Sequence, residues 1–344
     1  MASQPSSLIQ TGGAGAGAAI DFETTKEIGF YGLVWRRFKA RRIALVSAIT
    51  LCVITAACFI IPHFLPAECA DLSQLNNGAP LGPFSTGHSN GQACNGVPAG
   101  SYFHLLGTDD TGRDLFRRVL SGGQISLIVG VLAMSLTMAI ATVLGALGGF
   151  FGGIVDTLIT ALTNGILAIP SILILIILVR AVNGNNDANF LFFGQQNTAV
   201  LIIVVAIAFI AWPTTARIIR SVILSTREKE FVEAARAVGT SRFRIITRHL
   251  IPNALGPIVV SASLTISIAI LTESAISFLG YGIQEPTPTW GKLLDEGRNA
   301  LVNYPDTGIW YAFWPGMLIL ISVLSFNYIG DALRDAFDPR SIER

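Results

Sequence analysis

The stretch Glu230–Asn253 reads EFVEAARAVGTSRFRIITRHLIPN, and it is the longest segment of this chain that combines helical periodicity with many charges. Apolar or small residues recur in it at the spacing i, i+3, i+4, i+7 of one helix face, at Phe231, Ala234, Ala235 and Val238. Gly239 follows them, as expected for a residue with positive φ just past a helix end. The stretch predicts two short helices at an angle, and its alanines would let another surface approach closely. Periodicity leaves open the alternative that the pair rests on anionic lipid.

Residues with capping side chains flank both predicted helices. Ser225 and Glu228 are spaced as a capping box before the first helix. Thr240 or Ser241 can cap the second helix. The apolar residues of the second helix and the proline that breaks it are Phe243, Ile246, Leu250 and Pro252.

The composition places this segment in a membrane protein. Of the 344 residues, 51% are hydrophobic and only 13% are charged, and the mean hydropathy is +0.59. Soluble domains carry about 25% charged residues. The net charge of +1 is uninformative about partners, because the charges are segregated along the chain.

Six stretches without Asp, Glu, Lys or Arg are long enough for the roughly 20 apolar residues of a membrane helix. They lie between Arg42 and Glu68, Arg118 and Asp156, Asp156 and Arg180, Asp187 and Arg217, Arg248 and Glu273, and Asp306 and Asp331. The fifth is expected to continue past Glu273 to Leu279. The sequence GALGGFFGG, at the end of the second, predicts a glycine-rich end or turn. The fold class is therefore all-α and polytopic, with six transmembrane helices.

Basic residues orient these spans. They concentrate in WRRFKARR (Trp35–Arg42), between the fourth and fifth spans, and in the C-terminal tail, whereas 67–107 and 183–197 contain no Lys or Arg. The positive-inside rule makes the basic side cytoplasmic, with both termini there. The predicted organisation is a cytoplasmic tail and basic segment at 1–42, a first span at 43–66, an outer loop at 67–122, a five-helix core at 123–330 with the charged segment at 221–252, and a cytoplasmic tail at 331–344.

One arginine-containing stretch, Thr108–Gly123, falls on the predicted outer side. Its apolar residues have helical spacing, and Asp114 and Arg118 lie at i and i+4. Thr108 or Asp109 can cap its start and Gly122 can end it. The stretch predicts a separate amphipathic helix at the outer interface.

The four cysteines fall into two pairs. Cys52 and Cys58 lie in the first span and are expected to be buried apolar residues. Cys69 and Cys94 lie in the outer loop, where oxidising conditions favour a disulfide between them over two free thiols.

The charged segment resembles a known loop. EAARAVG followed by HLIPN is similar to the EAA loop of permease subunits of bacterial ATP-binding-cassette importers, and Arg248-His249 agrees with their dipeptide/oligopeptide branch. Three more stretches resemble the C-type permease subunit of that branch: LGTDDTGRDLFRRVLSGGQISLIVG (Leu106–Gly130), SFLGYGIQEPTPTWGKLLDEG (Ser277–Gly297) and FNYIGDALRDAFDPR (Phe326–Arg340). The outer loop at 67–104 is longer than is usual in this family.

This resemblance implies the type I importer permease fold and a place in a bacterial cell membrane. It implies four kinds of partner: a homologous second permease subunit, two cytoplasmic ATPase subunits or domains, an extracytoplasmic substrate-binding protein and membrane lipid. It also assigns the contact with an ATPase to residues Glu233, Ala234, Ala235, Arg236, Gly239, Thr240, Ser241 and Arg244. The function implied is import of short peptides; nickel chelates or another small solute are the alternative within the family.

The chain lacks a phosphate-binding G-x-x-x-x-G-K-[ST] motif, a metal-ligand constellation and a Ser/His/Asp arrangement. We therefore expect no catalytic residues, no metal and no cofactor in this chain, with ATP and Mg bound by partner subunits, and no nucleic-acid partner. A secondary transporter would instead show repeats and interrupted spans with paired charges. A scaffold that binds anionic lipid through the basic loop is a third hypothesis.

Glu273 is the only acidic residue well inside a predicted span. A charged side chain facing lipid would cost about 2.5–3.5 kcal/mol, so Glu273 should face protein or water. It is a candidate for the pathway or its gate. The alternative is a hydrogen bond to a neighbouring helix.

Overall fold

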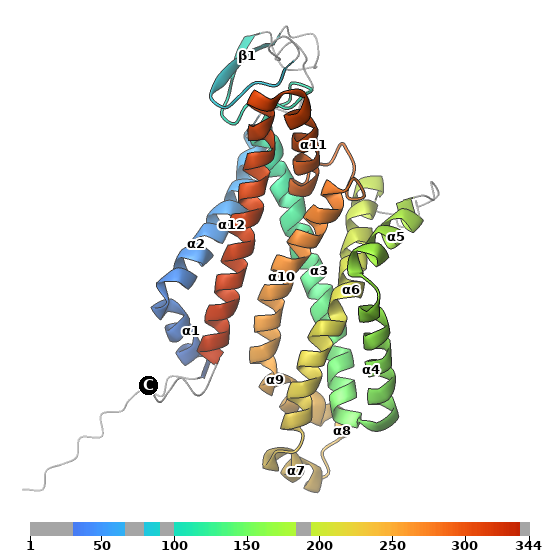
Figure 1. Cartoon of the computed structure of the whole chain (residues 1–344). Coiled ribbons are helices and arrows are strands. Elements are labelled where there is room, and N and C mark those ends of the chain that lie inside the picture. Colours follow the sequence, from blue (N-terminus) through green and yellow to red (C-terminus); the bar gives the residue numbers. More distant parts are fainter. Residues whose placement is uncertain (1–29, 66–78, 90–99, 184–193, 338–344) are drawn as a thin grey trace, which may run out of the picture.

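The computed structural model describes residues 30–65, 79–89, 100–183 and 194–337. Five long apolar helices lie side by side in it (Figure 1), and each is long enough to cross a membrane. They are α2 (Arg42–Ile60), α3 (Leu115–Phe151), α6 (Gly194–Thr226), α10 (Leu255–Phe278) and α12 (Pro305–Phe337). A sixth span is present if the bent pair α4 (Gly153–Ala168) and α5 (Ser171–Asn183) is counted as one.

That sixth span is broken, which corrects the expectation of one continuous helix between Asp156 and Arg180. The two halves meet at 86°. Ile169 is extended, with φ −97° and ψ 134°, and Pro170 follows it. A residue before proline is pushed out of the α region by the proline ring, which accounts for the break.

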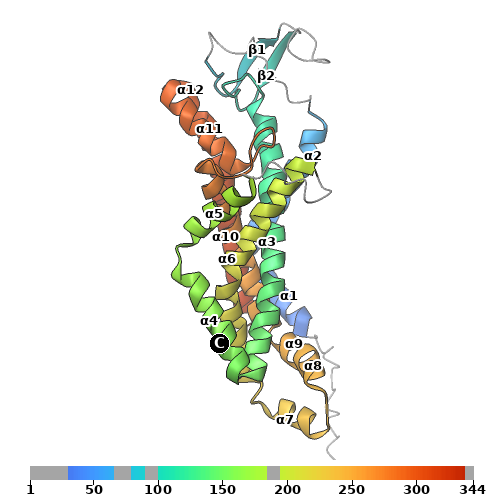
Figure 2. The ribbon, with the colours of Figure 1, turned by 90° about the vertical axis from the view of Figure 1, so that its right-hand side faces the viewer.

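Shorter elements lie at the two ends of the helical bundle (Figures 1 and 2). At the end called here the hairpin end are β1 (Ser85–Ser89), β2 (Gly100–His104) and α11 (Trp290–Asn303). The strands are antiparallel, with Thr86 opposite Phe103. At the other end, called the α7 end, are α1 (Phe30–Ala40), α7 (Glu230–Ala237), α8 (Arg242–Ile245), the π-helical turn η3 (Ile246–Leu250) and α9 (Ile251–Asn253). A short 3-10 turn, η1 (Ile61–His63), follows α2.

The start of α3 corrects the prediction of a separate interfacial helix. The helix begins at Leu115, where the Asp114 side chain accepts a hydrogen bond from the Arg117 backbone N–H at 2.9 Å. Thr108 and Asp109 are therefore not its caps. Gly122 does not end the helix, because α3 continues through it. A Cβ at Gly122 would lie 3.2 Å from the backbone of Thr289, so this glycine allows close packing.

The far end of α3 is also helical where a glycine-rich turn was expected. In GALGGFFGG the helix persists to Phe151, and only Gly152 and Gly153 have positive φ, at +65° and +52°. The glycines before them contact α6. A Cβ at Gly145 would lie 2.8 Å from the Ala216 carbonyl oxygen, and one at Gly149 would lie 2.9 Å from the Arg220 carbonyl oxygen. Small residues at such contacts let membrane helices approach closely.

The cysteine predictions have mixed outcomes. Cys58 is fully buried, as expected. Cys52 is exposed on the surface of this chain, so the prediction that it is buried was wrong. Cys69 and Cys94 lie outside the described residues, and their disulfide stays a prediction.

Candidate functional site

The segment α7–α9 is held to the bundle by a few apolar side chains. Val232, Ile245 and Leu250 are fully buried, and they share one cluster with Phe150 of α3 and Ile223 of α6. The segment therefore rests on the ends of α3 and α6. A displacement of the segment would reach these two helices directly.

Two arginines add polar contacts to this apolar attachment. Arg227, which follows α6, donates to the Gly149 carbonyl oxygen at 3.0 Å, near the end of α3. The Arg236 guanidinium lies over the Phe150 ring, 5.6 Å from its centroid. Both contacts join the charged segment to the last turn of α3.

Gly239 ends α7 as the sequence predicted. Its φ is +78°, and a Cβ there would meet no atom within 4 Å. The Gly239 N–H donates to the Arg236 carbonyl at 2.9 Å, and the Thr240 N–H donates to the Ala235 carbonyl at 3.0 Å. These two bonds form a Schellman motif, which satisfies the last carbonyls of a helix.

The predicted caps and apolar face are largely wrong. Ser225 lies inside α6, where its hydroxyl donates to the Val222 carbonyl at 2.9 Å. The first helix begins only at Glu230, so the predicted capping box is absent, and Ser241 stands at the start of α8 without a side-chain hydrogen bond. The buried residue of α7 is Val232, whereas Phe231 and Val238 of the predicted apolar face are exposed. Packing against the bundle, and not the helical spacing, therefore determines which side of α7 is buried.

The predicted ATPase-contact residues lie on the outer surface of α7, α8 and the turn between them. Most are exposed, and Ala235 and Thr240 are partly buried. Two large apolar side chains are exposed beside them, Val238 at 86% and Phe243 at 76%. Exposed apolar side chains next to small residues are typical of a surface that a partner covers. This surface, residues 231–244, is called the tip below.

Glu273 is buried where α10 meets α3. Its carboxylate accepts hydrogen bonds from Ser126 at 3.0 Å and Ser277 at 2.7 Å. The Ser126 hydroxyl also accepts from the Trp290 backbone N–H at 3.1 Å, at the start of α11. Glu273 thus joins three helices, an arrangement that favours the hydrogen-bond interpretation over the gate.

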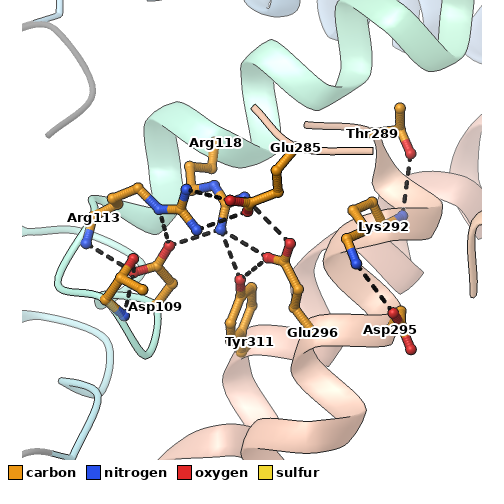
Figure 3. A network of polar contacts seen from close by, with 10 residues as sticks. Asp109, Arg113, Arg118, Glu285, Thr289, Lys292, Asp295, Glu296 and Tyr311 are labelled. Carbon is orange, nitrogen blue, oxygen red and sulfur yellow. Dashed lines mark hydrogen bonds and ion pairs between the residues drawn. The ribbon is translucent and has the colours of Figure 1, made fainter. Parts of the chain in front are cut away.

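A charged network that sequence reasoning missed lies at the hairpin end, around Arg118 (Figure 3). The Arg118 side chain is only 1% exposed. It donates to Asp109 at 2.7 Å, Glu296 at 2.8 Å and Glu285 at 2.9 Å, and to the Tyr311 hydroxyl at 2.8 Å. The predicted Asp114–Arg118 pair is therefore replaced by Asp109, which precedes the same helix, and by three partners far away in sequence. The charges themselves were visible, but no periodic spacing connects them.

Glu285 and Glu296 occupy different electrostatic surroundings in this network. Hydrogen bonds from Arg113 lower the pKa of the Glu285 carboxyl to about 2, and the charge of Arg118 acts in the same direction. Burial raises the pKa of the Glu296 carboxyl. Asp109 and Glu296 together balance Arg113 and Arg118, and Glu285 adds a third carboxylate that is about half exposed.

A groove of ≈ 560 Å³ runs between α5, α6 and α10. Its walls are mainly apolar. The hydroxyl-bearing residues along it are Ser171, Thr214, Thr215, Ser261, Thr265 and Thr272. Glu273 does not line this groove. A membrane-embedded groove with spaced hydroxyls offers hydrogen bonds to a polar solute without fixed charge.

Comparisons with known proteins give consistent results. The family described as "Binding-protein-dependent transport system inner membrane component" matches residues 141–343, and the "N-terminal TM domain of oligopeptide transport permease C" matches residues 29–80. The dipeptide transport system permease protein of Alkalihalophilus pseudofirmus is 41% identical over 69% of this chain and 72% of that protein.

Two further relatives cover more of the chain. The oligopeptide transport system permease protein of Haemophilus influenzae is 36% identical over 89% of this chain and 87% of its own length. The glutathione transport system permease protein of Pectobacterium atrosepticum is 33% identical over 89% of this chain and 90% of its own length.

Proposed function

Because this chain belongs to the family of binding-protein-dependent transport system inner membrane components, we propose that it forms half of the pathway of an ATP-driven importer of short peptides. It is a membrane permease subunit. The other half would be a homologous second permease subunit. Two cytoplasmic ATPase subunits, which bind ATP and Mg, and an extracytoplasmic substrate-binding protein would complete the importer, and this chain would have no catalytic role.

The attachment of the tip to α3 and α6 is the observation that carries this proposal. A surface that receives force from an ATPase must be exposed to the partner and firmly joined to the membrane helices. The tip exposes Val238 and Phe243, while Val232 and Leu250 are buried in the cluster that holds it. ATP binding would move the tip and, through it, α3 and α6. This requires the ATP-bound partner to have different contact free energies with the two permease conformations.

The groove between α5, α6 and α10 is the part of the translocation pathway that we propose this chain to form. The Thr265 and Thr272 hydroxyls donate to carbonyls of α10 at 2.7 Å, so their oxygens are left to accept hydrogen bonds from the amide N–H groups of a peptide backbone. Two of the groove's hydroxyl-bearing residues, Thr215 and Thr265, lie on helices that also lead to the tip. Movement of the tip would therefore change the groove.

The proposed orientation places the α7 end in the cytoplasm of a bacterial cell and the hairpin end outside. The distribution of basic residues supports it, because α1 and the segment α7–α9 lie at the α7 end, where α12 also ends. Both termini would then be cytoplasmic. A tip inside the cell is also where ATP is available.

The class of solute rests on the relatives. Two of them are named for dipeptide and oligopeptide transport, and one for glutathione, which is itself a short peptide. Dipeptides and oligopeptides are therefore the first proposed solutes, and glutathione is the second. Nickel chelates remain an alternative from the sequence resemblance alone.

Purification of the tagged chain from the membranes of its own host tests the assembly. We expect a second permease and ATPase subunits in fixed stoichiometry by mass spectrometry. In vesicles that contain the complex, the binding protein and internal ATP, we expect uptake of a labelled dipeptide. Unlabelled glutathione should lower that uptake to a measurable extent. A chain that purifies without an ATPase, or that takes up solute without ATP, would contradict the proposal. A complex that hydrolyses ATP but responds to no peptide would contradict only the solute.

A further inference from the structure

A second cavity, of ≈ 390 Å³, lies at the α7 end between the start of α2 and the end of α12. It is lined by Arg41, Arg42, Ile43, Ala44, Tyr328, Asp331 and Ala332. The lining combines two guanidinium groups and a phenol with apolar side chains. It is far from the groove between α5, α6 and α10, and nothing in the proposed transport mechanism uses it.

The two arginines of this cavity differ in their partners. Arg41 forms an ion pair with Asp335 at 2.5 Å, which joins the start of α2 to the end of α12. Arg42 is exposed, and within the described part of the chain its guanidinium has no hydrogen bond or ion pair. A guanidinium presents five N–H donors in a planar fork that suits phosphate oxygens.

The surrounding charge is strongly positive. The sequence WRRFKARR supplies five basic residues just before the first span, whereas the cavity and its rim hold the two carboxylates Asp331 and Asp335. The excess of positive charge favours an anion even though Asp331 lines the same cavity. An anion would also relieve the repulsion between Arg41 and Arg42.

The cavity lies at the boundary between the apolar core of the membrane and water. Arg42 is the first residue of α2, and the apolar residues of that span follow it. On α1, which packs against α2 and α12, Trp35 is 58% exposed, stacks on Phe38 and lies under the Lys39 ammonium at 4.8 Å. Exposed Trp beside basic residues is typical of a helix at the level of lipid headgroups.

We propose that this cavity binds the phosphate of an anionic phospholipid of the cytoplasmic leaflet. The headgroup phosphate would contact the Arg42 guanidinium and the Tyr328 hydroxyl, and the acyl chains would follow the exposed apolar face of α2. A lipid fits better than a soluble phosphate, because exposed Ile43 and other exposed apolar residues of α2 continue the cavity toward the hydrocarbon. Basic pockets between membrane helices on this side commonly hold such headgroups. The proposal rests on the proposed orientation but not on the transported solute.

Native mass spectrometry of the full chain tests this proposal in mixed micelles that contain equal amounts of a phosphatidylglycerol and a phosphatidylcholine with the same acyl chains. We expect the wild-type chain to retain more phosphatidylglycerol than phosphatidylcholine. Arg42→Gln should lower that retention about fivefold, which corresponds to the loss of one basic residue near an anionic lipid. Arg42→Lys should fall between the two, because it keeps the charge but loses the planar fork.

Lys39→Gln is the matched control, because it removes the same charge from an exposed position outside the cavity. A smaller effect of Lys39→Gln than of Arg42→Gln supports a site in the cavity. Equal effects would show diffuse attraction only and would overturn the proposal. So would equal retention of the two lipids by the wild-type chain, or loss of bound phosphatidylglycerol to a large excess of inorganic phosphate. The readout needs no ATPase, so its failure is separate from a failure of the importer assignment.

Discussion

At the scale of single residues, Glu273 shows how a membrane helix can carry a carboxyl group without exposing it to lipid. Ser126, Ser277 and the protein around them surround it completely. Burying a polar group is tolerated when its hydrogen bonds are made, and costs free energy when they are not. In this arrangement its hydrogen bond to Ser126 joins α10 to α3.

Substitution of Glu273 separates structural from pathway roles. Glu273→Leu should lower the free energy of unfolding by about 1–3 kcal/mol, because it removes the acceptor of two buried hydroxyls. Glu273→Gln keeps the shape and one acceptor, so we expect a smaller loss and near-normal uptake. Thermal unfolding in detergent and peptide uptake in vesicles measure the two effects. A stable, assembled Gln variant with clearly reduced uptake would restore the gate interpretation.

Gly239 is constrained by its backbone conformation and not by its neighbours. A Cβ there has open space, so any effect of a substitution comes from φ +78°. A β-branched residue pays roughly 1 kcal/mol or more in that region, whereas Asn adopts it readily.

Gly239→Val should therefore lower uptake and substrate-stimulated ATP hydrolysis while expression survives, because α8 changes its angle to α7. Gly239→Asn is the control of similar size and should retain most of the activity. Both activities are measured on the reconstituted complex. Equal activity of the Val and Asn variants would show that the turn conformation does not matter for coupling.

At the scale of elements, the contact between α3 and α6 depends on glycines. Gly145 and Gly149 lie one turn apart and face the backbone of α6. Both helices also hold the tip. So close a contact would transmit a displacement of one helix to the other.

Gly149→Leu should force α3 and α6 apart and lower stability by roughly 1–3 kcal/mol. The reason is that even a Cβ would lie 2.9 Å from Ile223 and from the Arg220 carbonyl. Gly165→Leu is the control, because a Cβ at Gly165 meets nothing within 4 Å. The melting temperature (Tm) of the two variants in the same detergent gives the comparison. A similar Tm for both would mean that the helix contact can adjust.

The loop between α10 and α11 is attached to α3 by charge. Glu285 accepts from Arg113 at 2.9 Å and from Arg118 at 2.9 Å. Since the pKa of Glu285 is lowered from 4.5 to about 2, its stabilising effect is complete above its ordinary pKa and is lost as the pH falls toward 2. Partial exposure of Glu285 limits the size of this effect.

We therefore expect Glu285→Gln to lower the Tm at neutral pH, and the Tm difference from the wild-type chain to shrink at about pH 3. Asp306→Asn serves as the control, because Asp306 is exposed and forms no ion pair among the described residues. Its Tm difference should stay small at both pH values. A difference for Glu285→Gln that grows on acidification would contradict the assigned direction.

At the scale of the whole molecule, the two ends carry different surfaces. The hairpin end has strands, α11 and the Arg118 network, and the α7 end has the tip and most of the basic residues (Figure 1). This asymmetry is what an importer needs, since it receives solute on one side and force on the other.

Single cysteines at the two ends test the proposed orientation. In cells that produce this chain without its ATPase partners, Val238→Cys should react with a membrane-impermeant maleimide only in inside-out vesicles, and Phe103→Cys should react in intact cells. Both side chains are well exposed, at 86% and 61%. The parent chain reports the labelling of its native cysteines and is subtracted. Labelling of the Val238→Cys variant in intact cells would reverse the proposed topology.

Several properties of this protein follow from the sequence alone. Apolar length and the position of charges are properties of a linear chain, so they predicted the membrane class, the spans and a single basic end. The positive φ of Gly239 was also predictable, because the conformation just past a helix end depends on local sequence. The EAA stretch is contiguous, and it sufficed to indicate the family that the comparisons confirmed.

Only the tertiary structure decided which side chains meet. Arg118 was expected at an interface, but it is buried, and Glu285 and Glu296 from distant segments join nearby Asp109 in compensating its charge. Gly149 was expected in a turn, but it lies inside α3, where the absence of a side chain lets α6 approach closely. Val232, rather than Phe231, holds the tip because the ends of α3 and α6 lie on its side of the helix. In each case the outcome depends on contacts between segments far apart in sequence, which spacing along the chain does not encode.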